Sequence, residues 1–188
     1  MEHAAPEGSG AMSAVLGMDA AVIEDVLNGR EGVSIANYNC PGQIVITGEA
    51  DAVAEAGTVL KEAGARRVLP LKVSGPFHSP MMRPAGEELA KVFARVSMNP
   101  LKIPYVANIN AEVITDCGRI EGLLVEQVSG SVRWQQSVET MIREGVDTFV
   151  EIGPGKTLTG FLRKIDKNVK AYHIGSWEEA VQVCEELK

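Results

Sequence analysis

The sequence VSIANYNCPGQIVITGE, residues 33–49, predicts a β-hairpin and with it the architecture of the first half of the chain. Residues 33–37 and 44–47 contain the β-branched side chains that favour strands. The turn-forming run Asn39-Cys40-Pro41-Gly42 lies between them, as in a hairpin connection. An antiparallel pair of this kind needs further elements to bury one of its faces.

The flanking residues predict those elements in a regular order. On the N-terminal side, a short strand at 12–16 precedes a helix bounded by residues 19 and 29, a capping Asp and a terminating Gly. On the C-terminal side, an alanine-rich helix at 50–63 precedes a strand at 66–73. The order β-α-β-β-α-β over residues 11–73 predicts a ferredoxin-like subdomain.

The second half of the chain predicts a separate α/β part. A loop at 74–80 marks the expected boundary, which gives subdomains at 11–73 and 74–188. Strands at 148–152 and 169–174 enclose a helix, which implies a parallel pair with a right-handed crossover. The remaining predicted elements are helices at 81–96, 120–128, 134–143 and 157–165, a last helix that a Ser176–Glu179 capping box opens, and strands at 103–109 and 112–115.

Composition limits the class of protein. The chain has 188 residues, 45% hydrophobic and 23% charged, a balance typical of a folded soluble domain. The net charge of −7 disfavours nucleic-acid binding, since nucleic-acid phosphates are also negative. No apolar run predicts a membrane helix, and the start, MEHAAPEGSG, has no signal-peptide pattern. Three widely spaced cysteines fit neither a zinc site nor a disulfide framework, so we expect a cytoplasmic protein.

His78 is the strongest candidate for chemistry. It lies in the loop Ser74-Gly75-Pro76-Phe77-His78-Ser79-Pro80, between a predicted strand and a predicted helix. Such loops often hold reactive groups on a rigid scaffold, and an imidazole suits a general base near neutral pH. A structural role is the alternative, and it is the one we expect for His173, which falls in a predicted strand.

Three other features each allow a structural and a functional interpretation. The run Gly153-Pro154-Gly155-Lys156 could be a strand-to-helix turn or an anion site. We favour the turn, because the run lacks the phosphate-loop spacing. Asn37, Asn39 and Gln43 are turn formers whose amides also suit a pantetheine-like chain, and Cys40 is interpreted as a turn residue and not a nucleophile. The basic residues form a solvated face or receive an acidic protein: Lys61, Arg66, Arg67 and Lys72.

Six stretches together resemble the C-terminal part of the malonyl-CoA:acyl carrier protein transacylases, a family of acyltransferases of fatty-acid synthesis. They follow the family's order and spacing and cover nearly the whole chain. The stretches are PEGSGAMSAVLG (6–17), NYNCPGQIVITGE (37–49), GARRVLPLKVSGPFHSPMMRPAGEEL (64–89), IPYVANINAEVIT (103–115), SVRWQQSVETMIREGV (131–146) and FVEIGPGKTLTGFLRKI (149–165).

The resemblance implies an α/β-hydrolase-like core that carries the ferredoxin-like subdomain. It also implies malonyl transfer from CoA to the pantetheine thiol of acyl carrier protein, through a malonyl-serine intermediate. The family's catalytic histidine falls on His78, and the backbone carbonyl that orients its ring falls on Arg133. Malonyl-CoA and acyl carrier protein are the implied partners, with no metal or redox cofactor.

The resemblance also assigns binding residues. Asn37, Asn39 and Gln43 match the family's hairpin near the thioester arm, with Asn39 the favoured contact. An aromatic residue at the position of Phe77 goes with malonyl units, because a ring beside the α-carbon leaves little room for a methyl group. Arg66 and Arg67 are candidates for docking the carrier protein.

The chain departs from the family pattern in one respect. It has no G-H-S-x-G nucleophile motif, no G-Q-G-S-Q oxyanion segment and no malonyl-binding arginine. Ser79 adjoins His78, but neighbours in an extended loop point apart. We therefore expect a fragment that supplies the histidine half of the site and is inactive alone, with an exposed apolar surface that needs a complementing segment or self-association. A non-catalytic remnant that binds acyl carrier protein or CoA, or a fragment without function, is the alternative.

Overall fold

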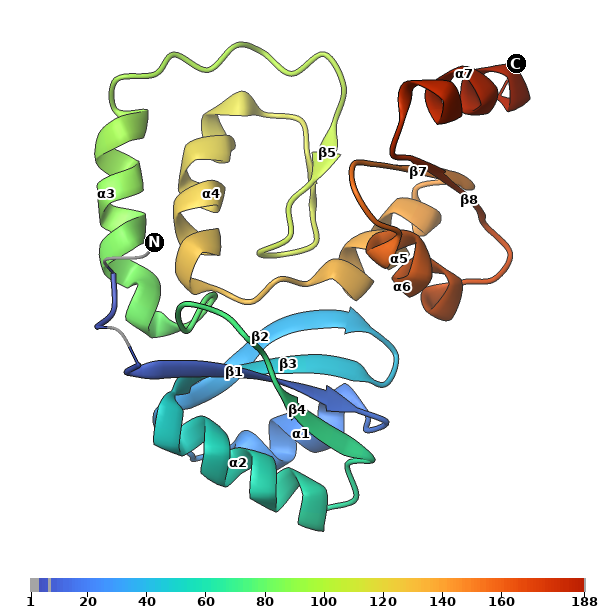
Figure 1. Cartoon of the computed structure of the whole chain (residues 1–188). Coiled ribbons are helices and arrows are strands. Elements are labelled where there is room, and N and C mark those ends of the chain that lie inside the picture. The colour runs from blue at the N-terminus through green and yellow to red at the C-terminus, as the bar shows by residue number, and fades with distance from the viewer. Residues whose placement is uncertain (1–3, 7, 188) are drawn as a thin grey trace.

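The computed structural model describes residues 4–6 and 8–187, which form a mixed α/β fold (Figure 1). The first half is a four-stranded antiparallel sheet with strand order β2-β3-β1-β4 and two helices, α1 and α2. Its elements are β1 (Gly10–Leu16), α1 (Ala20–Leu27), β2 (Val33–Cys40), β3 (Gln43–Glu49), α2 (Ala50–Glu62) and β4 (Arg67–Pro70).

The second half is mostly helical. Helices α3 and α4 lie side by side, and β7 and β8 form a parallel pair. Its elements are the 3₁₀ turn η1 (Pro80–Met82), α3 (Arg83–Phe93), β5 (Tyr105–Val106), β6 (Val113–Ile114), the 3₁₀ turn η2 (Cys117–Arg119), α4 (Ile120–Ser129), α5 (Trp134–Arg143), β7 (Thr148–Ile152), α6 (Thr157–Ile165), β8 (Lys170–Ile174) and α7 (Trp177–Glu186).

The predicted hairpin is confirmed, with a tighter turn than expected. Strands β2 and β3 pair antiparallel from Val33↔Gly48 to Cys40↔Gln43, so Asn39 and Cys40 belong to the strand. Irregularities in β2 absorb the additional residues in the register. The turn itself is reduced to two residues, and its Gly42 has the positive φ of 72° that such turns require.

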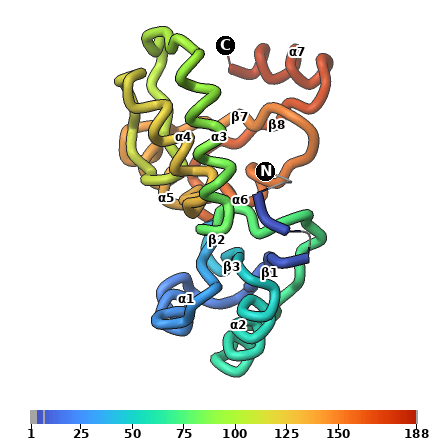
Figure 2. Tube along the Cα trace, turned by 90° about the vertical axis from the view of Figure 1, so that its left-hand side faces the viewer, coloured from blue at the N-terminus to red at the C-terminus, as the bar shows by residue number. Residues whose placement is uncertain are grey.

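The main core lies between the sheet and its two helices. Figure 2 shows α1 and α2 on one side of the sheet and the second half of the chain on the other. Burial of this apolar face is the main source of stability for a sheet of this size. The fully buried side chains of this core include Val15, Ile23, Ile44, Ile46, Val53 and Leu60.

Gly48 lies where the backbones of β3 and the start of β2 leave no room for a side chain. It has φ 148° and pairs with Ala11 on one side and Val33 on the other. A Cβ atom at this position would lie 1.9 Å from the Gly32 carbonyl oxygen, which is backbone and cannot swing aside. The join between β3 and the start of β2 therefore requires glycine.

The parallel pair predicted near the C-terminus is also confirmed. Strands β7 and β8 pair in parallel from Thr148↔Lys170 to Ile152↔Ile174, and α6 connects them. Helix α7 then packs against β8. Several large hydrophobic side chains of the second half are strongly exposed, among them Ile152 and Trp177 at 78% each and Ile103 at 76%.

The strands expected at 103–109 and 66–73 are several residues shorter than predicted, because local turns end their pairing. The strand expected at 103–109 is reduced to β5, since a turn with Ala111 at φ 57° follows, closed by the Ala111 N–H on the Ala107 carbonyl oxygen at 2.8 Å. The strand expected at 66–73 ends at Pro70, because the Val73 N–H then bonds locally to the Leu71 carbonyl oxygen. Over the described part of the chain, no helix is long and apolar enough to cross a membrane.

Candidate active site

His78 lies in the loop between β4 and η1, with a backbone that few residues adopt. Its φ is 59°, in the left-handed region, where His, Asn and Asp are found more often than other non-glycine residues. The ring is partly buried, and its Nδ1 lies 3.0 Å from the backbone carbonyl oxygen of Gln127. The loop therefore holds the histidine in one orientation against the C-terminal end of α4.

Ser79 stabilises this loop and is not available as a nucleophile. Its side chain is fully buried, and its hydroxyl donates to the Pro76 carbonyl oxygen at 2.7 Å. The Ser79 carbonyl accepts the Met82 N–H at 2.9 Å, which begins the 3₁₀ turn η1. These bonds close the loop on both sides of His78 and direct the two neighbouring side chains to different partners.

The expected role of the Arg133 carbonyl is wrong. That carbonyl accepts the Ser137 N–H at 2.8 Å, as the first hydrogen bond of α5, and the His78 ring meets the carbonyl of Gln127. The Arg133 guanidinium lies over the Tyr38 ring, 5.6 Å from its centroid. Burial and the hydrogen bond to Glu24 raise the pKa of Tyr38 to about 12, so this tyrosine stays protonated.

Gln127 was not found from the sequence, although a physical signal for it existed. The last four carbonyls of a helix have no partner within that helix, and α4 ends at Ser129 before a glycine. Gln127 is therefore one of four residues whose carbonyl was free to accept from a side chain. The sequence did not reveal which side chain, because 49 positions separate Gln127 from His78.

The contact with Gln127 fixes the chemistry of the imidazole. A carbonyl oxygen only accepts hydrogen bonds, so the Nδ1 of His78 carries the proton. In the neutral ring, Nε2 then has a free lone pair. Nε2 is thus the ring atom that can accept a proton in this tautomer.

Phe77 and Asn37 lie over the same face of the sheet, opposite α1 and α2. Phe77 packs against a small buried cluster formed by Met12, Ala14, Ala36 and Val45. Asn37 is the cross-strand partner of Val45, and directly opposed residues point to the same face. The structure therefore brings the predicted amide and the predicted aromatic residue to the face next to His78.

Gln43 and Asn39 lie at the hairpin end. The Gln43 side-chain oxygen is 3.4 Å from the Lys164 ammonium of α6, so this end of the hairpin meets the second half of the chain. Asn39 is half-buried, beside an irregularity in β2. Burial raises the pKa of the neighbouring Cys40 thiol, which keeps it protonated and fits its interpretation as a structural residue.

Arg66 and Arg67 are exposed and lie away from His78. They stand at the beginning of β4, whereas the histidine loop follows the end of that strand. Their side chains therefore face solvent on the first half of the chain.

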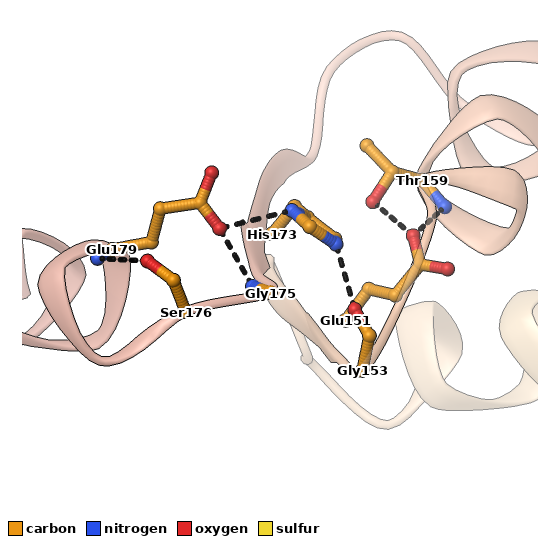
Figure 3. Close-up of polar contacts among 7 residues, drawn as sticks. All are labelled: Glu151, Gly153, Thr159, His173, Gly175, Ser176 and Glu179. Carbon is orange, nitrogen blue, oxygen red and sulfur yellow. Dashed lines mark hydrogen bonds and ion pairs between the residues drawn. The ribbon is translucent and has the colours of Figure 1, made fainter.

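The Gly153-Pro154-Gly155-Lys156 run forms a strand-to-helix turn, as interpreted from the sequence (Figure 3). The carboxylate of Glu151 already fills the N-terminal end of α6, accepting from the Thr159 N–H at 2.7 Å, the Thr159 hydroxyl at 2.5 Å and the Leu158 N–H at 3.1 Å. Burial alone would raise the pKa of Glu151, but these hydrogen bonds outweigh it and lower the pKa. An external anion would have to displace this carboxylate.

His173 has a structural role in the same region. Its Nε2 lies 2.9 Å from the Gly153 carbonyl oxygen, and its Nδ1 lies 3.5 Å from the Glu179 carboxylate (Figure 3). Glu179 accepts the Gly175 N–H at 2.6 Å, and the Ser176 hydroxyl accepts the Glu179 N–H at 3.2 Å. The predicted cap of the last helix is thus present, with the glutamate bonded one residue earlier than in an ideal capping box.

The stabilisation that Glu179 gives to α7 is expected to weaken as the pH falls. The Gly175 N–H lowers the pKa of Glu179; partial burial opposes this, and His173 and Lys156 add to it. Because the folded-state pKa is depressed, the stabilisation is complete above the ordinary glutamate pKa and is lost as the pH falls through the folded-state value. The difference in Tm between wild type and Glu179→Gln is therefore present at about pH 6 and closes toward about pH 3.

A matched variant separates this effect from a change in net charge. Glu185→Gln removes the same charge from an exposed position on α7 and should not produce a pH-dependent difference in Tm. A Glu179→Gln difference that stays constant from neutral to acid pH would contradict the assignment.

An apolar cleft of about 360 Å³ lies elsewhere, between β7, β8 and α6. Trp134 closes one side of it, and the cleft reaches neither His78 nor the hairpin amides. Among residues 4–6 and 8–187, no three His, Cys, Asp or Glu side chains gather as a metal site would require.

Comparison with known proteins finds an acyl transferase domain and relatives that match most or all of this chain. The model of the acyl transferase domain matches residues 1–183. The malonyl CoA-acyl carrier protein transacylase of Bacillus subtilis (strain 168) is 43% identical over 192 residues, covering 100% of this chain and 61% of its own length. That of Escherichia coli (strain K12) is 43% identical over 169 residues, covering 88% of this chain and 54% of its own.

Solved structures agree closely with the fold. The malonyl CoA-acyl carrier protein transacylase of Clostridium perfringens superposes with a TM-score of 0.94 at 39% identity, over 100% of this chain and 60% of that one. A malonyl-transacylase in complex with a type II PKS acyl-carrier protein gives a TM-score of 0.91 at 36% identity, over 98% and 61%. The chain spans about three-fifths of these relatives, in their C-terminal part. Domain match, sequence identity and superposition agree that the chain belongs to the acyl transferase family.

Proposed function

We propose that this chain supplies the histidine half of a site that transfers a malonyl group from CoA to the pantetheine thiol of acyl carrier protein. The observation that carries the proposal is the His78 ring, oriented by the Gln127 carbonyl so that Nε2 is free. The names of the relatives support the substrates, and the complex of one relative with an acyl-carrier protein supports the partner.

In the proposed mechanism, a serine from a segment outside this sequence is the nucleophile. His78 Nε2 takes the serine proton as the oxygen attacks the malonyl thioester carbon, and the ring then returns the proton to the departing CoA thiolate. Transfer to the carrier protein reverses these steps: the pantetheine thiol gives its proton to Nε2 and attacks the malonyl-serine ester. The Gln127 carbonyl and the end of α4 stabilise the imidazolium during both steps.

The hairpin face provides the proposed substrate contacts. Asn37 and Asn39 are assigned to hydrogen bonds with the pantetheine arm. Gln43 is assigned to a contact with the same arm at the end of the hairpin. Phe77 is assigned to the malonyl α-carbon, where its ring, held by a buried cluster, disfavours an additional methyl group. Such discrimination amounts to roughly 1–3 kcal/mol.

We assign the site to the boundary of two subdomains. Residues 11–73 are assigned to a ferredoxin-like subdomain, an assignment supported by the βαββαβ order and the antiparallel strand order β2-β3-β1-β4. Residues 74–188 are assigned to the C-terminal part of an α/β-hydrolase-like core, with support from the parallel pair β7–β8. The histidine loop begins at this boundary.

The function is tested with a hybrid enzyme, in which the N-terminal part of the Bacillus subtilis relative that lies outside the match is joined to the start of this chain. We expect no malonyl adduct in the intact mass of the 188-residue chain incubated with malonyl-CoA. The hybrid should form a malonyl-serine adduct and pass it to holo acyl carrier protein. A folded hybrid that forms no adduct would contradict the proposal, and carrier-protein binding without an adduct would favour a non-catalytic role.

Reversing the charge of Arg66 and Arg67 to glutamate is expected to raise the KM for acyl carrier protein in the hybrid by about tenfold, with the KM for malonyl-CoA unchanged. The physical reason is that two exposed cations attract the acidic carrier protein at low salt. Lys167→Glu with Lys170→Glu, also exposed, is the matched control for net charge. Equal losses with both substrates would argue against a docking role.

A further inference from the structure

The segment 130–133 lies along the edge of β2 and joins it through a single isolated β-bridge. Val132 pairs in parallel with Asn37, its N–H donates to the Ala36 carbonyl at 2.7 Å, and its carbonyl accepts the Tyr38 N–H at 2.8 Å. We call this segment the strap. Because the strap follows α4 directly, it joins the end of that helix to the strand that carries Asn37.

Ser131 secures the strap through its side chain. Its hydroxyl donates to the Ile35 carbonyl at 2.6 Å, so the strap holds β2 at Ile35, Ala36 and Tyr38 in succession. This side-chain bond spans 96 positions of sequence. A residue without a hydroxyl at position 131 would leave the Ile35 carbonyl without this partner.

The Gln127 side chain connects the strap to the histidine contact. Its amide nitrogen donates to the Gly130 carbonyl at 2.9 Å and to the Ser131 carbonyl at 3.3 Å. The backbone carbonyl of the same residue is the one that meets His78 Nδ1. One residue therefore holds the strap with its side chain and the catalytic ring with its main chain.

The amide of Gln127 is retained at a cost. Its side-chain oxygen is buried without a hydrogen-bond partner among the described residues. A buried polar atom without a partner is destabilising, so the amide contributes to stability only through its N–H donors. An apolar side chain of similar size would avoid the unpaired oxygen but would release the strap.

We infer that the Gln127 side chain and the Ser131 hydroxyl are positioning residues for His78. They fix the end of α4 against β2, and this fixes the Gln127 carbonyl on Nδ1 and selects the ring tautomer with Nε2 free. Strand β2, which carries the proposed pantetheine contact Asn37, and the proposed base His78 are then held in a fixed relative position. The catalytic role of His78 in this inference rests on the proposed function. The orientation of its ring does not, because it can be measured without turnover.

The test is the tautomer of His78 in the 188-residue chain, read from the ¹⁵N shifts of the imidazole by NMR in a mildly alkaline buffer where free histidine is neutral. Wild type should show a proton mainly on Nδ1. Gln127→Leu, which keeps the backbone carbonyl but loses the amide donors, should shift the tautomer ratio toward Nε2–H by about two- to tenfold, the range of one hydrogen bond. Ser131→Ala should shift it in the same direction by less, and Ser131→Thr should restore it.

Two controls keep the result specific. His173 is an internal control, since its ring contacts Gly153 and Glu179 and should keep its shifts in every variant. Gln182→Leu, on the exposed side of α7, is the matched substitution at a site unconnected to the strap. If Gln127→Leu does not fold, the milder Ser131 pair still decides the question.

An unchanged His78 tautomer in folded Gln127→Leu and Ser131→Ala would overturn the inference. Its failure is distinguishable from failure of the proposed function: a hybrid without transfer whose tautomer still responds refutes only the function. Transfer with an unresponsive tautomer refutes only the positioning role.

Discussion

Replacing His78 with alanine is expected to lower malonyl transfer by the hybrid about 10²- to 10⁴-fold, the usual contribution of positioned proton transfer. The neutral ring carries its proton on Nδ1 against Gln127, so in the proposed mechanism Nε2 is the atom that takes the serine proton. Without the ring, neither the attack nor the departure of the thiol has a proton carrier. The measurement is kcat for transfer from malonyl-CoA to holo acyl carrier protein.

The control variant is His78→Asn, because alanine alone would confuse two effects. The backbone at position 78 has φ 59°, which asparagine adopts at a lower cost in free energy than alanine. Asparagine keeps a polar side chain near Gln127 but cannot take up a proton. Both variants should therefore lose transfer alike while differing in Tm. Turnover that survives in either variant would remove His78 from the mechanism.

Gly48→Ala is expected to lower the free energy of unfolding by at least about 3 kcal/mol, because its methyl group would meet backbone atoms at a strained position. Its Cβ would lie 1.9 Å from the Gly32 carbonyl oxygen and 3.0 Å from the Val33 Cα. Both are backbone atoms at the start of β2, so relief requires the β2–β3 pair to separate there. Urea unfolding followed by far-UV circular dichroism measures the loss.

The matched variant is Gly64→Ala, at another glycine of positive φ. Gly64 has φ 103°, but no heavy atom lies within 4 Å of an added Cβ. Only the backbone strain applies there, and the expected loss is about 1 kcal/mol. The difference between the two variants isolates the close approach at Gly48. Equal losses would mean that the steric contact has relaxed at little cost.

The elements that were predictable from the sequence are those that local patterns determine. The hairpin at 33–49, the capped last helix and the parallel pair around α6 all follow from residues near one another in the chain. The strand expected at 103–109 was wrong beyond Val106, because a turn that depends on the left-handed Ala111 replaced a plausible β-branched run. An alanine gives no signal for that backbone.

The same distinction between local patterns and tertiary packing applies to the candidate site. His78 was recognisable, because its loop is a local feature. The Arg133 assignment failed and Gln127 was missed, since the partner of a ring depends on how α4 packs beside the histidine loop. The Ser131 bond to Ile35 is a contact of the same type, over a still longer separation. Local patterns thus located the candidate base, whereas tertiary packing determined which carbonyl its ring contacts.

At residue 78 the backbone conformation and the proposed chemistry favour different residues. Glycine would adopt φ 59° without strain, so a chain with glycine there loses the base but not the loop. Since glycine would not destabilise the fold at this position, only selection for the proposed activity would retain the histidine. Among descendants of this sequence, glycine at position 78 would mark lineages in which selection for the proposed acyl transfer has ended while selection for a folded chain continues.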